Sequence, residues 1–95
     1  MARRYRGGMD TVVLQTSPTG FRVLSGDGAP REVVLEHHTR RGLGVAGIPA
    51  LTVAEAIVGF LTERGALPTG PGPVDLGAAA GGFPEFVEDV RSRLS

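Results

Sequence analysis

The sequence predicts an α+β domain in which a three-stranded antiparallel meander is followed by two helices packing on the sheet. Three short segments rich in β-branched and other apolar residues come first, and turn residues separate them. The apolar spacing then changes from strand-like alternation to a helical period in two later segments. Strands and helices that are grouped along a chain, rather than alternating, are typical of the α+β class.

The three expected strands are short, and they span residues 11–16, 21–25 and 31–37. In the third, Val33 and Leu35 share one face and Val34 takes the other, as in a strand with one buried side. Residues 17–20 read Ser-Pro-Thr-Gly, in which proline presets φ and glycine accepts a positive φ, so they predict a tight turn. Residues 26–30 predict a second reversal of the chain.

The first expected helix, residues 53–64, carries the most regular amphipathic pattern. Its apolar residues recur at helical spacing, at Val53, Ala56, Ile57, Phe60 and Leu61. Thr52 and Glu55 have the spacing of a capping box, in which the threonine caps the helix and the glutamate reaches back. Gly65 follows the last turn, where a left-handed residue closes many helices.

A second helix is expected from Pro84 to the last residues of the sequence. Proline suits the first helical position, and the acidic residues lie early and the arginines late, which matches the helix dipole. The spacing of the charges predicts ion pairs between Glu88 and Arg91 and between Asp89 and Arg93.

Three stretches are expected to lack regular structure. Residues 1–9 predict a flexible basic arm, because two consecutive glycines separate it from the domain of residues 10–95. Residues 67–73, rich in proline and glycine, predict a linker. Residues 77–82 contain only glycine and alanine and predict a connector.

Composition restricts the classes of function. All ten basic residues are arginines, and ten acidic residues balance them, so the net charge is zero. Nucleic-acid binders usually carry a basic excess, so nucleic acid is not the expected partner. The sequence has no cysteine, which excludes disulfides and cysteine–zinc sites. No apolar run approaches the roughly 18–20 residues of a membrane span, and no apolar segment of a secretory signal follows the basic start, so we expect a cytoplasmic protein without a membrane partner.

Residues 42–47 match the pattern G-x-G-x-x-G between an expected strand and an expected helix. In a dinucleotide-binding fold the third glycine lies in the first helical turn, whereas here the expected helix begins about five residues later, so we interpret the segment as a flexible loop. An anion held by this loop and the following helix start is the alternative. The residues expected to bind it are His37, His38, Arg40, Arg41, Gly42, Gly44, Gly47 and Thr52.

The sequence predicts neither a metal site nor a catalytic residue. His37 and His38 are adjacent at an expected strand end, where neighbouring side chains point to opposite faces and do not chelate one ion together. The serines do not occupy the Gly-x-Ser-x-Gly pattern of a nucleophile elbow. We therefore expect no cofactor, and a non-catalytic role is favoured over an enzymatic one.

Four short motifs occur between residues 44 and 94: Gly47-Ile48-Pro49-Ala50, the expected helix from Val53, Arg64-Gly65-Ala66-Leu67-Pro68, and Phe83-Pro84-Glu85-Phe86-Val87. Together they resemble the C-terminal segment of saccharopine-dehydrogenase-like oxidoreductases. That family carries its cofactor on an N-terminal dinucleotide-binding domain, for which this chain has no room. The resemblance therefore implies a stand-alone counterpart of a substrate or dimerisation portion, without hydride transfer and with no catalytic residue carried over.

The function expected from these observations is protein association, as a homodimer or as an accessory subunit of a partner protein. A small core gains stability from pairing, and a short meander leaves sheet edges that another chain can extend. A three-stranded sheet is not expected to cover the apolar sides of both helices. The residues expected at the interface are therefore those of the second helix: Phe83, Phe86, Val87 and Val90.

Overall fold

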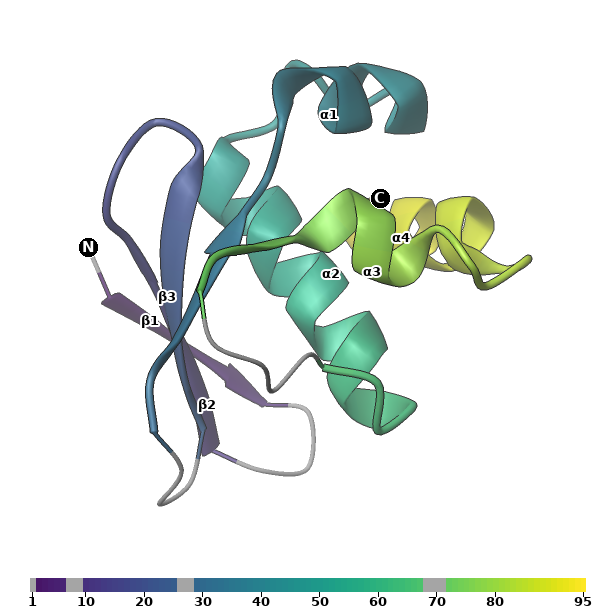
Figure 1. Cartoon of the computed structure of the whole chain (residues 1–95). Helices are drawn as coiled ribbons and strands as arrows, with labels where there is room; N and C mark the ends of the chain where they lie inside the picture. The colour runs from purple at the N-terminus through teal and green to yellow at the C-terminus, as the bar shows by residue number, and fades with distance from the viewer. Residues whose placement is uncertain (1, 7–9, 26–28, 68–71) are drawn as a thin grey trace.

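The computed structural model describes residues 2–6, 10–25, 29–67 and 72–95. The helices of these ranges lie on one side of the sheet (Figure 1). Along the chain the elements are β1 (Ala2–Arg6), β2 (Asp10–Gln15), β3 (Gly20–Ser25), β4 (Arg31–Val34), α1 (His37–Leu43), α2 (Ala50–Glu63), β5 (Val74–Asp75), α3 (Leu76–Ala80) and α4 (Phe86–Leu94). The predicted α+β class is confirmed.

The predicted meander is confirmed in β2, β3 and β4, which are consecutive antiparallel neighbours in a sheet of order β1-β2-β3-β4-β5. The turn between β2 and β3 is also confirmed. The backbone N–H groups of Thr16 and Ser17 donate to the carbonyl of Gly20 at 2.9 and 3.2 Å, and the Ser17 hydroxyl accepts from Gly20 N–H at 2.8 Å. The loop expected at residues 26–30 lies mostly outside the described residues.

Two further strands extend the meander. Residues 2–6, part of the expected arm, run antiparallel to β2 as β1, whereas residues 7–9 lie outside the described residues. At the opposite edge β5 pairs with β4 in parallel, with Val74 beside Val33 and Asp75 beside Val34. A strand of two residues has no periodicity that a sequence pattern reveals, so β5 was not predictable in this way. The sheet is mixed as a result.

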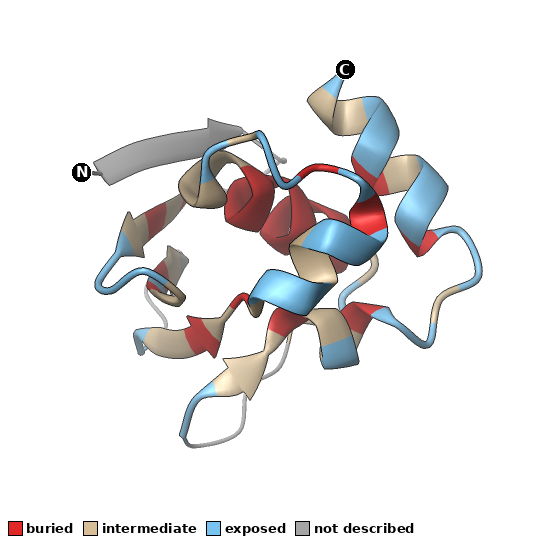
Figure 2. Cartoon of the chain, turned by 90° about the horizontal axis from the view of Figure 1, so that it is seen from above, coloured by how far each residue is buried: buried red, intermediate tan, exposed pale blue. Residues whose placement is uncertain are grey.

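The inward side of the sheet and α2 form the core. Alternate strand residues are almost fully buried, and they are Val13, Phe21, Val23, Val33 and Leu35. In α2 every residue from Val53 to Leu61 is buried, so the helix is covered all round rather than along one stripe (Figure 2). The sheet lies on one side of α2, and α3 and α4 pack against its other side (Figure 1).

The boundaries of α2 differ from the predicted ones. The helix begins at Ala50 with Pro49 at the N-cap, so Thr52 lies inside the first turn and the predicted capping box is wrong. Glu55, expected to reach back to the cap, is instead buried with 6% of its surface exposed. The C-terminal end is confirmed, since Gly65 has the expected positive φ of 62°.

Two short helices replace expected irregular or extended segments. The third strand ends at Val34 rather than residue 37, and α1 follows, because burial of Leu43 and left-handed closure at Gly44 (φ 73°) favour a helical turn. The connector predicted at residues 77–82 is wrong for its first four residues, which belong to α3. The carboxylate of Asp75 caps this helix and accepts from the N–H groups of Gly77 at 2.9 Å and Ala78 at 3.4 Å.

Candidate functional site

The histidines of the expected anion site lie at the start of α1. His37 and His38 are both exposed, and they are consecutive helical residues rather than residues of a strand end. The described residues contain no group of three or more histidine, aspartate or glutamate side chains that could hold a metal ion. The imidazoles are therefore separate groups that face solvent.

Arg40 makes hydrogen bonds to the backbone that the sequence did not indicate. Its guanidinium Nη2 donates to the carbonyl oxygens of Ala46 and Ile48 at 3.1 and 2.7 Å. These bonds tie α1 to the loop that leads into α2, so the predicted flexible loop is held by hydrogen bonds. Arg41, in contrast, is exposed at the end of α1. The guanidinium of Arg40, which an anion at this site would need as a donor, therefore binds carbonyl oxygens of the loop instead.

The remaining residues of the expected anion site are not brought together. Gly44 closes α1, Gly47 is exposed in the loop, and Thr52 lies within the first turn of α2. Of the eight expected residues, His38 and Gly42 line one groove, and the groove does not include the other six. The geometry therefore gathers only a minority of the expected anion ligands.

That groove, hereafter the α1–α3–α4 groove, has a volume of about 420 Å³. His38, Thr39 and Asp75 contribute its polar lining. Its apolar lining includes Leu43, Phe86 and Val87. Neither Thr39 nor Asp75 was among the expected site residues, although an aspartate before a short run of leucine, glycine and alanine was a signal for a helix cap.

The residues expected at an interface divide into buried and exposed groups. Phe86 and Val90 are 7% and 0% exposed, and they pack within the chain's own core. Phe83 is partly buried, with its ring edge-on to Phe60 at a centroid distance of 5.6 Å. Val87 is 44% exposed, more than any other large apolar residue of the described ranges. The structure therefore leaves only Val87 of this set well placed to meet another molecule.

One side of α4 combines Val87 with exposed polar neighbours. Pro84, Val87, Glu88 and Arg91 line one shallow depression, and we call these four residues the α4 outer face. The predicted ion pair between Glu88 and Arg91 is wrong, because the ion pairs of the described residues do not include it. Both charged groups therefore remain exposed beside Val87.

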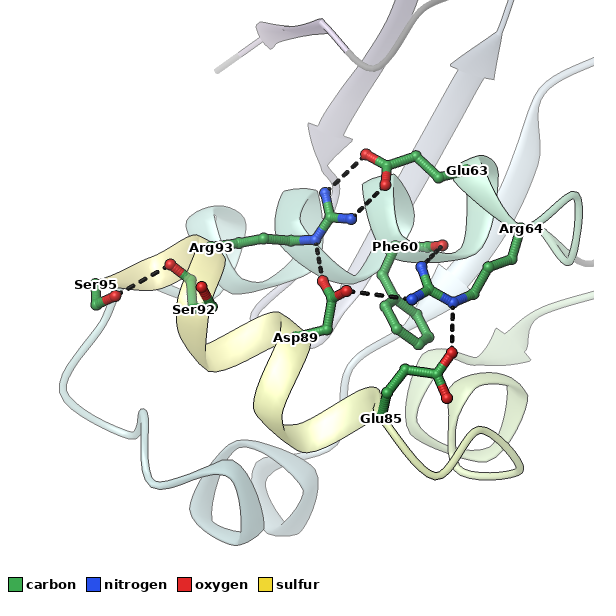
Figure 3. Close-up of polar contacts among 8 residues, drawn as sticks. All are labelled: Phe60, Glu63, Arg64, Glu85, Asp89, Ser92, Arg93 and Ser95. Carbon is green, nitrogen blue, oxygen red and sulfur yellow. Dashed lines mark hydrogen bonds and ion pairs between the residues drawn. The ribbon is translucent and has the colours of Figure 1, made fainter.

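The other charges of α4 form a chain of ion pairs to α2 (Figure 3). Arg93 binds Glu63 through two hydrogen bonds of 2.9 and 2.6 Å, and it donates to Asp89 at 2.6 Å, as predicted from their spacing. Asp89 also accepts from Arg64 at 3.2 Å, and Arg64 reaches Glu85 at 3.1 Å. Alternating charges thus hold α4 against the C-terminal end of α2.

Two carboxyl groups in this chain of ion pairs have a lowered pKa. The pKa of Asp89 lies below its ordinary value mainly because Arg93 donates a hydrogen bond to it, against a smaller opposing effect of desolvation. The pKa of Glu85 is lowered first by a hydrogen bond from its own backbone and then by the hydrogen bond from Arg64. Both carboxylates are therefore more easily kept ionised in the folded chain than in the unfolded one.

The first prediction concerns acid stability. Because the folded pKa of Asp89 is lowered, its contribution is present above the ordinary pKa of about 3.9 and is lost as the pH falls through the folded pKa. Asp89→Asn is expected to cost about 1 kcal/mol at neutral pH and to flatten the fall in stability below pH 5. Urea unfolding at a series of pH values measures both effects. Glu88→Gln removes an exposed carboxylate without an ion pair, and an equal change in that variant would contradict the prediction.

Comparison with protein-family models, with curated proteins and with solved structures finds no match to this chain. The resemblance of residues 44–94 to saccharopine-dehydrogenase-like oxidoreductases therefore stays a prediction. Within the described ranges, no helix combines the length and the apolar character that crossing a bilayer requires. The fold and the side-chain geometry are the basis for a functional proposal.

Proposed function

We propose that this chain is a non-catalytic α+β module that acts in the cytoplasm by protein association, and that it pairs with a second copy of itself. The observation that carries the proposal is the exposure of Val87 on the α4 outer face. The neighbouring apolar residues Phe86 and Val90 are buried, so Val87 is the large apolar side chain that α4 presents to solvent.

Charge supports a second copy as the partner. Glu88 and Arg91 lie beside Val87 with opposite charges, and neither enters an ion pair within the described residues. A two-fold axis makes each contact occur twice, so two antiparallel α4 helices bring Glu88 of each copy within reach of Arg91 of the other. The α4 outer face is therefore self-complementary, with an apolar centre and a charged margin.

The second prediction tests this pairing by sedimentation equilibrium over a tenfold range of concentration. The unaltered chain is expected to shift from monomer towards dimer as concentration rises. Val87→Asp places two carboxylates at the centre of the contact and is expected to weaken pairing at least about tenfold, equivalent to about 1.4 kcal/mol. The far-ultraviolet circular dichroism of this variant should match that of the unaltered chain, since Val87 is exposed.

Charge reversal supplies the matched control. Glu88→Arg puts like charges on facing helices and is expected to weaken pairing, as is Arg91→Glu. The variant that carries both substitutions again has opposite charges and is expected to recover it. A monomer mass that does not change with concentration would contradict the proposal, and so would a doubly substituted chain that pairs no better than either single variant. An accessory subunit that pairs only with another protein would give the first of these results.

A further inference from the structure

The α1–α3–α4 groove lies beyond the carboxyl ends of the two parallel strands of the sheet. Its parallel strands β4 and β5 are neighbours, and their carboxyl ends lead into α1 and α3 respectively. Ligands of open sheets with parallel strands bind outside these carboxyl ends, where the connecting segments leave a crevice. Here α1 and α3 border that crevice, and α4 closes one side with Phe86 and Val87.

The lining of the groove is mostly apolar and carries one carboxylate. Leu43 and Phe86 are 2% and 7% exposed and give the groove an apolar wall. Asp75 is the acidic residue in the lining, which contains no arginine within the described part of the chain. A volume of about 420 Å³ lies in the range of small-molecule sites, which combine apolar walls with few polar groups.

The carboxylate of Asp75 is held in a fixed position. Its Oδ1 atom accepts the hydrogen bonds from Gly77 and Ala78, whereas Oδ2 accepts none from the residues that the structure describes. The cap therefore orients the group without using both oxygens. A carboxylate that is already oriented binds a cation without a further loss of side-chain freedom. The same charge disfavours an anionic ligand in this groove.

We propose that the groove binds a small amine with an apolar body. The ammonium group of the ligand donates to Oδ2 of Asp75, and the apolar body packs on Leu43, Phe86 and Val87. His38 and Thr39 border the charged end of the ligand with an imidazole and a hydroxyl group. This inference does not rest on pairing through the α4 outer face, although Val87 lines both surfaces.

The third prediction uses three probes of matched shape: phenethylamine, 2-phenylethanol and 3-phenylpropionate. Amide chemical shifts of His38 and Ala78, which lie on α1 and α3, report binding in the groove by two-dimensional NMR. The amine is expected to bind saturably, the alcohol at least about tenfold more weakly, and the carboxylate not at all. Probe concentrations of about 10 mM suffice for a Kd of about 1 mM.

Asp75→Asn tests the role of the negative charge without disturbing the fold. Asparagine also caps helices through its side-chain oxygen, so α3 is retained while the negative charge is lost. This variant is expected to bind the amine at least about tenfold more weakly, and Glu32→Gln, which removes a carboxylate of β4 outside both the groove and the α4 outer face, is expected to bind it normally. Equal affinity for the three probes, unchanged amine binding by Asp75→Asn, or no saturable shift with the amine would each overturn the proposal.

Discussion

Phe60→Ala is expected to lower the free energy of unfolding by about 3–5 kcal/mol. Phe60 is fully buried, and its ring lies 5.6 Å from the ring of Phe83 and 5.5 Å from that of Phe86. The guanidinium of Arg64 lies 3.8 Å from the Phe60 centroid and adds a cation–π contact. Truncation to alanine removes the contacts of Phe60 with Phe83 and Phe86 and leaves a cavity. Unfolding in urea, followed by circular dichroism, measures the loss.

Phe60→Leu is the matched control for this position. Leucine retains most of the buried volume and loses the aromatic contacts, so a cost of about 1–2 kcal/mol is expected. Small domains have total stabilities of about 5–15 kcal/mol, so the alanine variant should be close to unfolding at body temperature. A loss below about 1 kcal/mol for Phe60→Ala would show that α4 contributes little to the stability of the core.

Gly77→Ala is expected to destabilise the chain by about 1–3 kcal/mol. An added Cβ would lie 2.5 Å from Oγ1 and 2.9 Å from Cγ2 of Thr39 and 3.3 Å from Oδ1 of Asp75. Because both γ atoms of the threonine are in the way, rotating its side chain does not relieve the contact. The clash outweighs the advantage of about 1 kcal/mol that alanine normally has in a helix. Thermal and urea unfolding report the sign.

Two companion variants test the cause of this effect. Thr39→Ala removes both γ atoms, so it is expected to recover much of the stability when it is combined with Gly77→Ala. Gly42→Ala places a Cβ where no atom lies within 4 Å and should raise stability by about 0.5–1 kcal/mol. If Gly77→Ala stabilised the chain as Gly42→Ala does, the close approach of α1 and α3 at this glycine would be wrong.

The elements predicted correctly are those with a regular pattern over several residues. Residues 11–16 are β-branched and apolar, residues 21–25 alternate, a proline–glycine turn separates them, and they form β2 and β3. The apolar stripe from Val53 to Leu61 lies within α2. The glycine at position 65 was enough to predict the left-handed residue that follows this helix. Local periodicity therefore accounted for most of the core.

The missed elements are short and depend on contacts between distant segments. α1 and α3 have seven and five residues, too few for a helical period, and β5 has two. The groove forms only because β5 pairs with β4, which brings Asp75 to α1. No pattern within either segment indicates that pairing, so the sequence did not predict that Asp75 lies near His38 and Thr39.

The expectation that Phe86 and Val90 remain uncovered is wrong because of how α2 is buried. Sequence reasoning treated the sheet as the only apolar surface available to the helices, so Phe86 and Val90 were expected to remain uncovered. In the structure α2 is buried all round and offers a second face to α4. The apolar stripe predicted between residues 53 and 61 covered one side of the helix, whereas Ala54 and Val58, which lie outside that stripe, are buried as well.

The parallel pairing of β4 and β5 also has a consequence for the order of folding. The hairpins of the meander close over short loops, whereas β5 joins β4 only after the chain has passed through the whole of α1 and α2. Contacts between segments so distant in sequence form slowly, because a long loop must close before they gain any energy. The two-residue edge strand is therefore expected to dock late, and binding in the groove would report completion of the native state.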